Sequence, residues 1–446
     1  MKPFISDNFL LGSDLAVSLY REVGDMGIVD FHNHLDPAAM AENRHYDNIG
    51  RLWVTADPYK HRAMRMCGVP ERLISGDADD YEKFLAWAEV CPKTLGGPLF
   101  HWSALEMKRV FGIDDTLCSG NAREIWDECN RHLGDGGLGC NDLLKKSGAE
   151  VLCTSDDFRD DVSVHVAASE KAGAQVRPSL RADSILSVPT EHKMLSDYLE
   201  FVKSRLDAFD AAGCLLADHA LDNGFSYVKI SDAAASSIFS SRRCADKASL
   251  NALRSYMLVW LAGEYASRGW VMQLHMGAQR YTSSRLRSLA GPAGGYASMG
   301  GCCDIASLCA FLDTVEAEGR LPRTILYTLN PSDNAAFATL CGSYAAEDGM
   351  PKLMFGPAWW YNDHKLGMES HMDVLGCYGL LSTFIGMTTD SRSFLSLSRH
   401  EYFRRILCNF LASKVASGEF PDDYALMKNM VTGISRDNAY NWIIKR

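Results

Sequence analysis

Residues 27–35 read Gly27-Ile28-Val29-Asp30-Phe31-His32-Asn33-His34-Leu35. The apolar residues of this stretch favour an extended strand, and two histidines spaced i, i+2 follow them. On an extended strand this spacing turns both imidazoles to the same side. Two neutral imidazoles that converge on one point suit a divalent transition metal, and zinc above all. The alternative is a structural histidine pair in a core or a loop.

Length, composition and charge are those of an ordinary globular chain. The protein has 446 residues, of which 47% are hydrophobic and 23% charged, and this allows one large domain with insertions or two to three domains. The net charge is −11, and no stripe of lysine and arginine gathers along the chain. We therefore expect no nucleic-acid partner.

Cysteine usage and apolar runs indicate the compartment. The fourteen cysteines are irregularly spaced, and a chain of this length does not need disulfides to fold, so reduced thiols are expected. The first residues lack the apolar segment of a signal peptide, and no apolar run reaches the ~20 residues of a membrane span. These features predict a cytoplasmic protein without a membrane partner.

Short apolar runs alternate with helical patterns through most of the chain. Eight β/α units predict a TIM (β/α)8 barrel, in which polar groups at the C-terminal strand ends line one mouth. The alternative is a doubly wound open sheet, which normally carries a glycine-rich turn at the position that His32-Asn33-His34 occupies here. The eight predicted strands are residues 27–31, 150–154, 176–180, 214–217, 270–274, 324–327, 352–355 and 384–389, with helical patterns between them such as 196–209, 250–267 and 305–318.

The interval between the first two predicted strands is too long for a single crossover helix. Helical patterns at 81–90, 99–110 and 122–133 predict instead that residues 40–145 form a helical insertion after the first strand. Residues 1–39 would then hold an N-terminal helix and the first strand, and residues 146–446 the remainder of the barrel.

Asp390 follows the eighth predicted strand. The first and last strands of a barrel are neighbours, so Asp390 can converge with His32 and His34. Two imidazoles and one carboxylate leave coordination positions open, as a catalytic metal requires. A carboxylate there can also take a proton, so ligand and base need not be separate roles. The alternative for Asp390 is a helix N-cap.

Further titratable residues end the predicted strands. Arg392 lies at the same rim and can bind oxyanions or neighbouring hydroxyls bidentately, although a lone surface arginine is the simpler interpretation. Asp218, His219 and His275 follow the fourth and fifth strands. Each alone is more often structural, but together, facing one mouth, they indicate a site.

Two other stretches face the predicted mouth. Trp359-Trp360 offer the apolar platform that sugar rings favour, whereas buried tryptophan pairs usually belong to a core. The stretch from Tyr281 to Gly301 is rich in glycine and is interpreted equally well as a plain surface loop or as a lid.

Several longer runs are specific enough to indicate one family. They are Asp30-Phe31-His32-Asn33-His34-Leu35, Tyr59-Lys60-His61-Arg62-Ala63-Met64-Arg65, Pro178-Ser179-Leu180-Arg181, Ala217-Asp218-His219-Ala220-Leu221-Asp222, Gln273-Leu274-His275-Met276-Gly277-Ala278, Leu329-Asn330-Pro331, Ala358-Trp359-Trp360-Tyr361-Asn362-Asp363, Thr389-Asp390-Ser391-Arg392 and Arg399-His400-Glu401-Tyr402-Phe403-Arg404-Arg405. Together they resemble the uronate isomerase (glucuronate isomerase) family of the amidohydrolase superfamily, over essentially the whole chain.

The resemblance implies a role for each matching residue. It makes His32, His34 and Asp390 the ligands of one divalent metal ion, with zinc expected and manganese, iron or cobalt as alternatives. Tyr59, from the helical insertion, would reach the carbonyl end of the sugar, and Arg392 the hydroxyls next to it. The family often has a histidine where this chain has Pro58, and this departure puts a pocket contact from position 58 in doubt. The remaining pocket residues would be Arg181, Asp218, His275, Arg280 and Trp359.

The resemblance also implies an aldose–ketose isomerase, expected to be a homo-oligomer. It would interconvert D-glucuronate with D-fructuronate and D-galacturonate with D-tagaturonate through a cis-enediol, with Asp390, Tyr59 and Arg392 as catalytic residues. One alternative is a metal-dependent amidohydrolase or lactonase, which the same metal and Asp390 would serve. The other is a barrel that binds sugar or metal without catalysis.

Overall fold

A parallel sheet of seven strands lies at the centre of the computed structural model, which describes residues 3–134, 136–187, 191–222, 224–345 and 351–445. The strand order is β1-β2-β3-β4-β5-β8-β9. The order of the strands in this sheet is therefore the same as their order in the sequence. A separate antiparallel pair joins β6 to β7. The strands are β1 Ile28–Asn33, β2 Ala149–Asp157, β3 Gln175–Arg181, β4 Leu216–Asp222, β5 Val271–Met276, β6 Ala278–Gln279, β7 Ser298–Met299, β8 Thr324–Thr328 and β9 Leu353–Phe355.

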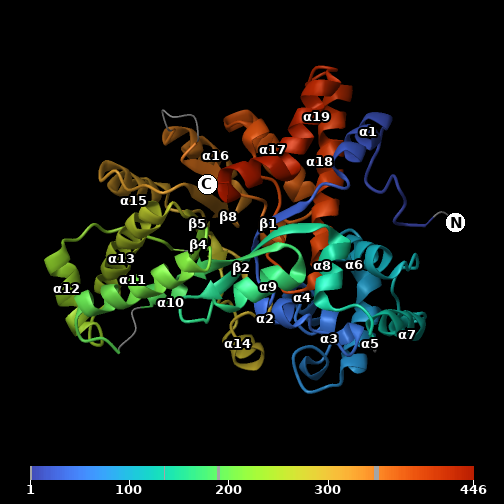
Figure 1. Ribbon diagram of the computed structural model, residues 1–446, viewed down its shortest axis with the longest axis horizontal. Helices are drawn as coiled ribbons and strands as arrows, with labels where there is room; N and C mark the ends of the chain where they lie inside the picture. Colours follow the sequence, from blue (N-terminus) through green and yellow to red (C-terminus); the bar gives the residue numbers. More distant parts are fainter. Residues whose placement is uncertain (1–2, 135, 188–190, 223, 346–350, 446) are drawn as a thin grey trace.

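Helices surround the central sheet (Figure 1). The predicted helices at 81–90, 122–133, 196–209, 250–267 and 305–318 are confirmed as α5, α7, α11, α13 and α15. The α-helices are α1 Asp14–Val23, α2 Pro37–Glu42, α3 Ile49–Trp53, α4 Pro58–Met66, α5 Asp80–Val90, α6 Pro98–Glu106, α7 Ala122–Leu133, α8 Cys140–Ser147, α9 Val164–Ala172, α10 Asp183–Leu186, α11 Leu195–Ala211, α12 Asp232–Ser241, α13 Lys247–Arg268, α14 Ser284–Ala290, α15 Ile305–Ala317, α16 Asn334–Ser343, α17 Lys365–Tyr378, α18 Ser398–Ala416 and α19 Tyr424–Thr432.

One face of the sheet encloses its own apolar core. Every second residue of a strand points to the same face, and one cluster accordingly combines Val29 and Phe31 of β1 with Ile325 and Tyr327 of β8. The C-terminal turn Tyr440–Ile444 adds Trp442 and its neighbours to this cluster. Apolar side chains therefore fill the space on the concave face of the curled sheet.

The chain between β1 and β2 forms the helices α2–α8. They have a core of their own, which includes Trp53, Phe84 and Trp87 and which continues onto Ile28 and Leu152 of the sheet. Figure 1 shows α3, α5, α6 and α7 together on one side of the sheet, and α11, α12 and α13 on the opposite side. The division of the chain at residues 39 and 145 stays a prediction.

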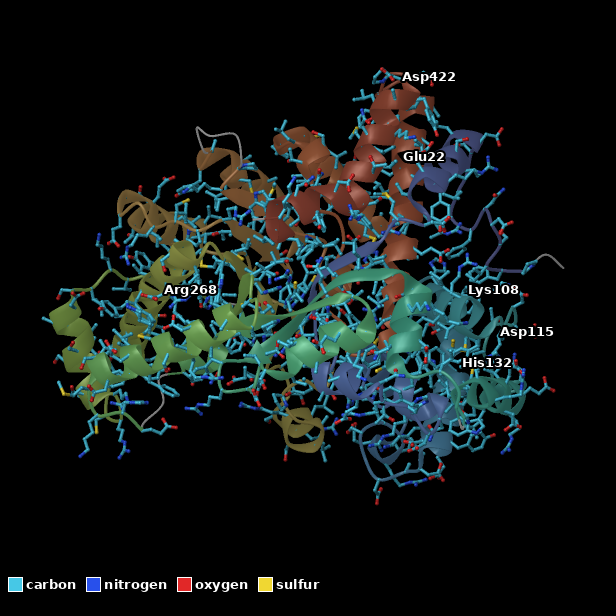
Figure 2. The ribbon with its side chains drawn as sticks, viewed as in Figure 1. Glu22, Lys108, Asp115, His132, Arg268 and Asp422 are labelled. Carbon is cyan, nitrogen blue, oxygen red and sulfur yellow. The ribbon has the colours of Figure 1, made fainter. Side chains whose placement is uncertain are left out.

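Charged side chains lie at the periphery of the molecule. The exposed carboxylates of Asp115 and Asp422 lie at the outer edges of the molecule (Figure 2). Nowhere in the part of the chain that the structure describes is a helix both long enough and apolar enough to cross a membrane.

The predicted eighth strand at residues 384–389 is wrong, because this segment has no strand structure. It nevertheless lies beside β1: Asp390 N–H donates to His32 O at 3.0 Å, and His34 N–H donates to Ser391 O at 2.8 Å. Gly386 and Asp390 both have positive φ, +78° and +47°, and these turns interrupt the extended backbone that a strand requires.

Side chains take the place of the missing strand hydrogen bonds. The Thr388 hydroxyl accepts from the His32 N–H at 2.9 Å and lies 2.6 Å from Asp30 Oδ1, to which it donates. Thr389 donates its N–H to Asp30 Oδ1 at 3.0 Å and its hydroxyl to Asp30 Oδ2 at 2.6 Å. Asp30 is fully buried, so one carboxylate joins the first strand to the last segment of the sheet region.

Asp30→Asn is expected to destabilise the protein. An amide would turn an N–H₂ group toward the two threonines that now donate to a carboxylate, and the cost of such a buried mismatch is about 2–4 kcal/mol. Denaturant unfolding monitored by circular dichroism measures this loss. The control is Asp25→Asn, which removes the same charge at an exposed position nearby. Equal stability of the two variants would contradict the proposed role of Asp30.

Candidate active site

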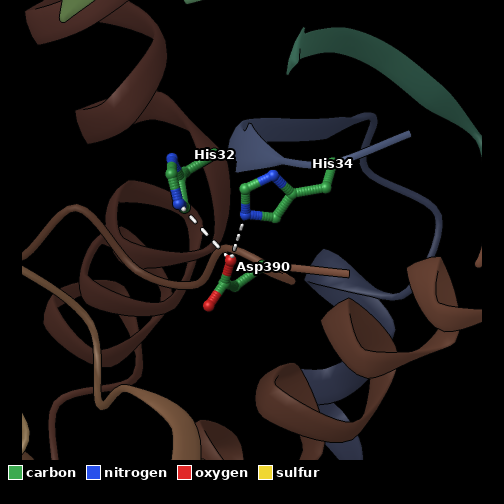
Figure 3. Close-up of side chains that lie close together, drawn as sticks. All are labelled: His32, His34 and Asp390. Carbon is green, nitrogen blue, oxygen red and sulfur yellow. Dashed lines mark ion pairs between the residues drawn. The ribbon is translucent and has the colours of Figure 1, made fainter. Parts of the chain in front are cut away.

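Two histidines and one aspartate converge at the end of β1. His32 Nε2 lies 3.4 Å and His34 Nε2 3.0 Å from Asp390 Oδ1. Figure 3 shows both imidazoles directed at the same carboxylate oxygen. His32 lies within β1, whereas His34 follows its last residue. A register shift between Asp30 and Asn33 breaks the regular alternation of side chains there, as irregularities near sites often do.

Two tryptophans fix the other oxygen of Asp390. Trp359 Nε1 donates to Asp390 Oδ2 at 3.0 Å, and Trp360 Nε1 donates to the same oxygen at 2.7 Å. Asp390 and Trp360 are both non-glycine residues with positive φ, a conformation that costs energy and is common at functional sites. The carboxylate is therefore held in one orientation, with Oδ1 toward the imidazoles and Oδ2 toward the indoles.

The electrostatics of this cluster favour an ionised Asp390. Burial raises the pKa of Asp390, but the hydrogen bonds and charges of His32 and His34 outweigh burial and hold the pKa well below its usual range. Burial also lowers the pKa of His34, which favours the neutral imidazole that binds metals. For His32 burial acts in the same direction, but nearby carboxylates, led by Asp218, raise its pKa.

A second charged pair adjoins the first cluster. His275 Nδ1 lies 2.7 Å from Asp218 Oδ1, and the His275 ring is 4.9 Å from that of His32, centroid to centroid. His32, Asp218 and His275 also form a group of possible metal ligands whose atoms lie within 4.8 Å of one another. Burial raises the pKa of Asp218, but His275 and His32 outweigh it and hold the pKa well below its usual range.

The expectation that His219 faces the mouth is wrong. His219 is fully buried, and its ring packs against Tyr265 of α13 at 5.6 Å between centroids. Burial lowers its pKa to about 4. His219 directly follows Asp218 on β4, so it points to the opposite face of the strand. His219 is therefore a buried structural residue and not part of the site.

The clusters open into a cavity of ≈ 260 Å³. This is slightly smaller than the ~300–1,000 Å³ of typical drug-sized ligand sites, and it suits a small polar ligand. With the exception of His219, the structure brings the site residues predicted from the sequence to the wall of this cavity, although their individual roles stay predictions. The residues are His32, His34, Tyr59, Arg181, Asp218, His275, Arg280, Trp359, Asp390 and Arg392.

Helix α4 places Tyr59 in the cavity wall. The Asp57 carboxylate caps the helix by accepting from the N–H groups of Tyr59 and Lys60 at 2.9 and 3.3 Å. Pro58 occupies the first turn, where its missing N–H costs nothing. Pro58 itself also lines the cavity. Tyr59 thus enters the site from the first turn of a well-capped helix.

The arginines of the cavity differ in their partners. Arg181 Nε lies 3.1 Å from Asp183 Oδ2, and Arg280 Nε lies 2.5 Å from Asp222 Oδ1. Arg392 is the exception, since no hydrogen bond or ion pair to it occurs among the residues that the structure describes. An arginine with free donors at a cavity wall can bind an anionic or hydroxyl-bearing ligand.

The segment from Tyr281 to Gly301 forms part of the cavity wall. It contributes Tyr281, Pro292, Ala293, Gly295 and Ala297 to the lining, so it is more than a plain surface loop. Side chains from outside the segment bind its backbone carbonyls: Arg62 and Tyr361 bind Ala297 O at 2.9 and 2.6 Å, and Arg65 binds Gly294 O. The interpretation of the segment as a lid stays a hypothesis.

Arg62, Tyr281 and Tyr361 also line the cavity, and none of them was predicted as a site residue. Arg62 and Tyr361 lie within the runs Tyr59–Arg65 and Ala358–Asp363 that carry the resemblance, so the sequence partly indicated their role. Tyr281 lies at the start of the glycine-rich stretch, where spacing alone does not indicate which side chain faces a cavity.

Comparison with known proteins identifies the family. The family model described as glucuronate isomerase matches residues 1–443. The chain belongs to the uronate isomerase family. Members from Caldanaerobacter subterraneus and Pectobacterium carotovorum, both named uronate isomerase, are 38% and 42% identical to it, and the similarity covers 99% of this chain and 100% and 99% of theirs. The resemblance seen in the sequence is confirmed.

Solved structures of the uronate isomerase family agree with this fold. The uronate isomerase from Thermotoga maritima has a TM-score of 0.92 at 30% identity, over 99% of this chain and 100% of the other. The glucuronate isomerase from Caulobacter crescentus has a TM-score of 0.90 at 24% identity, over 99% and 97%. A putative metal-dependent hydrolase from Lactobacillus casei reaches 0.57 at 13% identity, over 95% and 96%, a similarity of fold alone.

A buried acid lies behind the tryptophan pair. Asp363 is 3% exposed and lines a small void beside Tyr59, Trp360 and Asp390. Burial, reinforced by the charge of Asp390 and opposed by Arg399, raises its pKa to about 7. The folded protein therefore keeps a proton on Asp363 that the unfolded chain loses near its ordinary value of 3.8.

The stabilisation that protonated Asp363 provides is fully present below about pH 4 and is lost progressively as the pH rises to about 7. Asp363→Asn stays neutral throughout, so we expect its unfolding free energy to rise relative to the unsubstituted protein by on the order of 3 kcal/mol between about pH 5 and about pH 8. Urea unfolding at several pH values measures the difference. The control is Asp422→Asn at an exposed position, whose unfolding free energy relative to the unsubstituted protein should show no such rise. A difference for Asp363→Asn that does not change with pH would contradict the assignment.

Proposed function

We propose that this chain interconverts D-glucuronate with D-fructuronate and D-galacturonate with D-tagaturonate. The observation that carries the proposal is the full-length match to proteins named uronate isomerase, at 38–42% identity. The cavity supports it, because its ≈ 260 Å³ suit a six-carbon sugar acid. Arg392, without a protein partner among the described residues, offers donors for the oxygens of such a ligand.

We propose further that His32, His34 and Asp390 hold one divalent metal ion, zinc in the first place. Zinc bonds of about 2.0–2.2 Å in tetrahedral geometry separate ligand atoms by roughly 3.3 Å, and the observed separations from Asp390 Oδ1 are 3.4 and 3.0 Å. The donor set also accepts manganese, iron or cobalt. When bound, the ion would supply Lewis-acid chemistry for oxygens of the sugar.

The isomerisation removes a weakly acidic proton from C2 and returns a proton to C1. Asp390 is ionised and fixed by its indole and imidazole partners, so it can start proton removal at C2 together with the C5 hydroxyl. The C2–H electron pair becomes the C1=C2 bond of a cis-enediol, while the C1 oxygen takes a proton. Tyr59 is the donor to that oxygen, and Arg392 binds the oxygens at C1 and C2 as negative charge develops on them.

The second half of the reaction reverses these transfers. The hydroxyl on C2 returns a proton to the Tyr59 oxygen and becomes a carbonyl, and C1 receives the proton that was removed from C2, which yields the ketose and restores both groups. Arg181, Asp218, His275, Arg280 and Trp359 line the same cavity and would orient the rest of the sugar. Orientation of this kind accounts for a large share of catalysis, since small displacements of reacting groups cost much of the rate.

The fold and the state of the protein in the cell are part of the proposal. We propose a TIM barrel completed by residues 384–391, supported by their two backbone hydrogen bonds to the β1 strand and His34, with residues 40–145 as an insertion. A cytoplasmic location is consistent with the large number of cysteines, six of which are buried. A homo-oligomer stays the expectation of the sequence resemblance.

Activity on both uronates tests the proposed reaction. Metal-loaded protein incubated with D-glucuronate or D-galacturonate should give the corresponding ketose without hydrolysis. Tyr59→Phe removes the donor to the C1 oxygen, so we expect kcat to fall by about 10²–10⁴-fold. The control is Tyr46→Phe, in the same helical region but outside the cavity, and it should keep its activity. Full turnover by Tyr59→Phe would remove the role proposed for Tyr59, and hydrolysis products would favour the lactonase or amidohydrolase alternative.

Metal analysis tests the proposed ligands. Protein dialysed against zinc should retain one ion per chain, whereas His34→Ala should lose most of it, because two remaining ligands bind a divalent ion weakly. The control, His132→Ala, removes a partly exposed histidine far from the cavity and should bind normally. Removal of the metal by a chelator should abolish isomerisation, and each of the four candidate metals can then be added back. Full activity without metal would refute this part of the proposal.

A further inference from the structure

The run Arg399–Arg405 has no part in the chemistry proposed above, yet its first residue lies directly behind the site. Arg399 is the second residue of α18 and only 1% exposed. Its Nη1 donates to Thr389 O at 3.2 Å, and Thr389 immediately precedes Asp390. The Arg399 guanidinium therefore contacts the backbone of the segment that supplies the carboxylate of the site.

The same guanidinium lies against two aromatic rings. Its central carbon is 3.9 Å from the ring centroid of Trp102 and 5.2 Å from that of Tyr59. The two rings themselves meet edge to face, with centroids 5.8 Å apart and planes at 89°. Tyr59 comes from α4 and Trp102 from α6, so Arg399 joins two helices of the 40–145 region to the segment before Asp390.

Arg399 has no contact ion pair that would explain its burial. Among the residues described, no carboxylate lies within 4.0 Å of its guanidinium. Asp57, Glu106 and Asp363 act on it only through longer-range charge. Two of them have partners of their own, since Asp57 pairs with Lys60 at 2.5 Å and Glu106 accepts from Trp53 Nε1 at 2.5 Å. A buried cation without a contacting carboxylate is a poor source of stability.

The hydroxyl of Tyr59 has no hydrogen-bond partner among the described residues. Its orientation therefore depends on the contacts of its ring, which include those with Trp102 and Arg399. Burial and the charge of Asp390 raise the pKa of Tyr59, whereas the charge of Arg399 lowers it. Arg399 consequently supports both the position of the ring and any negative charge that develops on its oxygen.

We propose that Arg399 is a positioning residue for the isomerisation, which holds the Tyr59 ring in a fixed place relative to the segment that carries Asp390. The inference rests on the proposed function, in which Tyr59 and Asp390 act on one substrate. A guanidinium can stack on the rings and donate to Thr389 O at the same time, because it is planar and has five donors. A lysine ammonium has the charge but not this geometry.

Arg399→Lys in the zinc-loaded protein tests the proposal. We expect kcat on D-glucuronate to fall by about 10-fold or more while KM changes by less than about 3-fold, since displacement of a reacting group reduces the rate far more than binding. In a Tyr59→Phe background the same substitution should reduce kcat by less than about 2-fold, because residues that act through one another are not additive. Residual rates are followed by exchange of the C2 proton for solvent deuterium.

The matched control is Arg404→Lys. Arg404 is buried in the same helix, but it donates to backbone oxygens of Met26 and Gly27 at 2.7 and 2.9 Å, before the start of β1. Its replacement should lower the melting temperature without changing kcat. If Arg399→Lys does not fold, Trp102→Phe shrinks the ring beneath the guanidinium and should give the same Tyr59-dependent loss of kcat.

Three results would overturn the proposal. One is a wild-type kcat for Arg399→Lys, and another is an equal loss of kcat in the Tyr59 and Tyr59→Phe backgrounds. The third is a crystal structure of Arg399→Lys in which Tyr59 and Asp390 keep their relative positions. Full turnover by Tyr59→Phe alone would overturn the role proposed for Tyr59 and the positioning claim together, whereas a failure of the Arg399 variants alone leaves the proposed function intact.

Discussion

Hydrogen bonds between Asp30 and the pair Thr388–Thr389 fix where the site residues meet. The two partners are far apart in the sequence, and a carboxylate buried among three donors joins them where strand-to-strand hydrogen bonds would otherwise run. His32 and His34 lie just beyond Asp30, and Asp390 follows Thr389. The separation between the imidazoles and the carboxylate, on which any metal chemistry depends, is therefore set by contacts of the residues that shortly precede His32 and Asp390 in the sequence.

Buried charge is arranged in two layers around the cavity. The inner layer consists of imidazoles and carboxylates within a few ångströms of one another, such as His275 with Asp218 and His34 with Asp390. The outer layer contains Arg399, Asp363 and the Asp57–Lys60 pair, which no ligand in the cavity needs to contact. In a low-dielectric interior such groups act over longer distances than they would in water. The polarity of the site therefore depends on residues at α4 and α18 and on Asp363, as well as on its walls.

The sequence allowed prediction of much of the fold, because most of the seven strands contain a short apolar run and the helices between them have a clear amphipathic period. The last strand could not be predicted correctly, because residues 384–389 have the same apolar composition although positive φ at Gly386 and side-chain hydrogen bonds replace the strand ladder. Strand ends also located the site residues, but alternation along β4 turns His219 away from the cavity. Arg399 could not be assigned to the site at all, because its position depends on packing between helices remote in the sequence.

The side-chain hydrogen bonds that reach the segment from Tyr281 to Gly301 from outside end on its main-chain oxygens, at Gly294, Ala297 and Gly300. Side chains in this part of the cavity wall are therefore free to change in evolution without loss of these hydrogen bonds. Such changes would let relatives alter their preference among sugars at little cost in stability. Gly295 is excluded from this freedom, because a Cβ there would lie 2.3 Å from the Pro58 carbonyl oxygen.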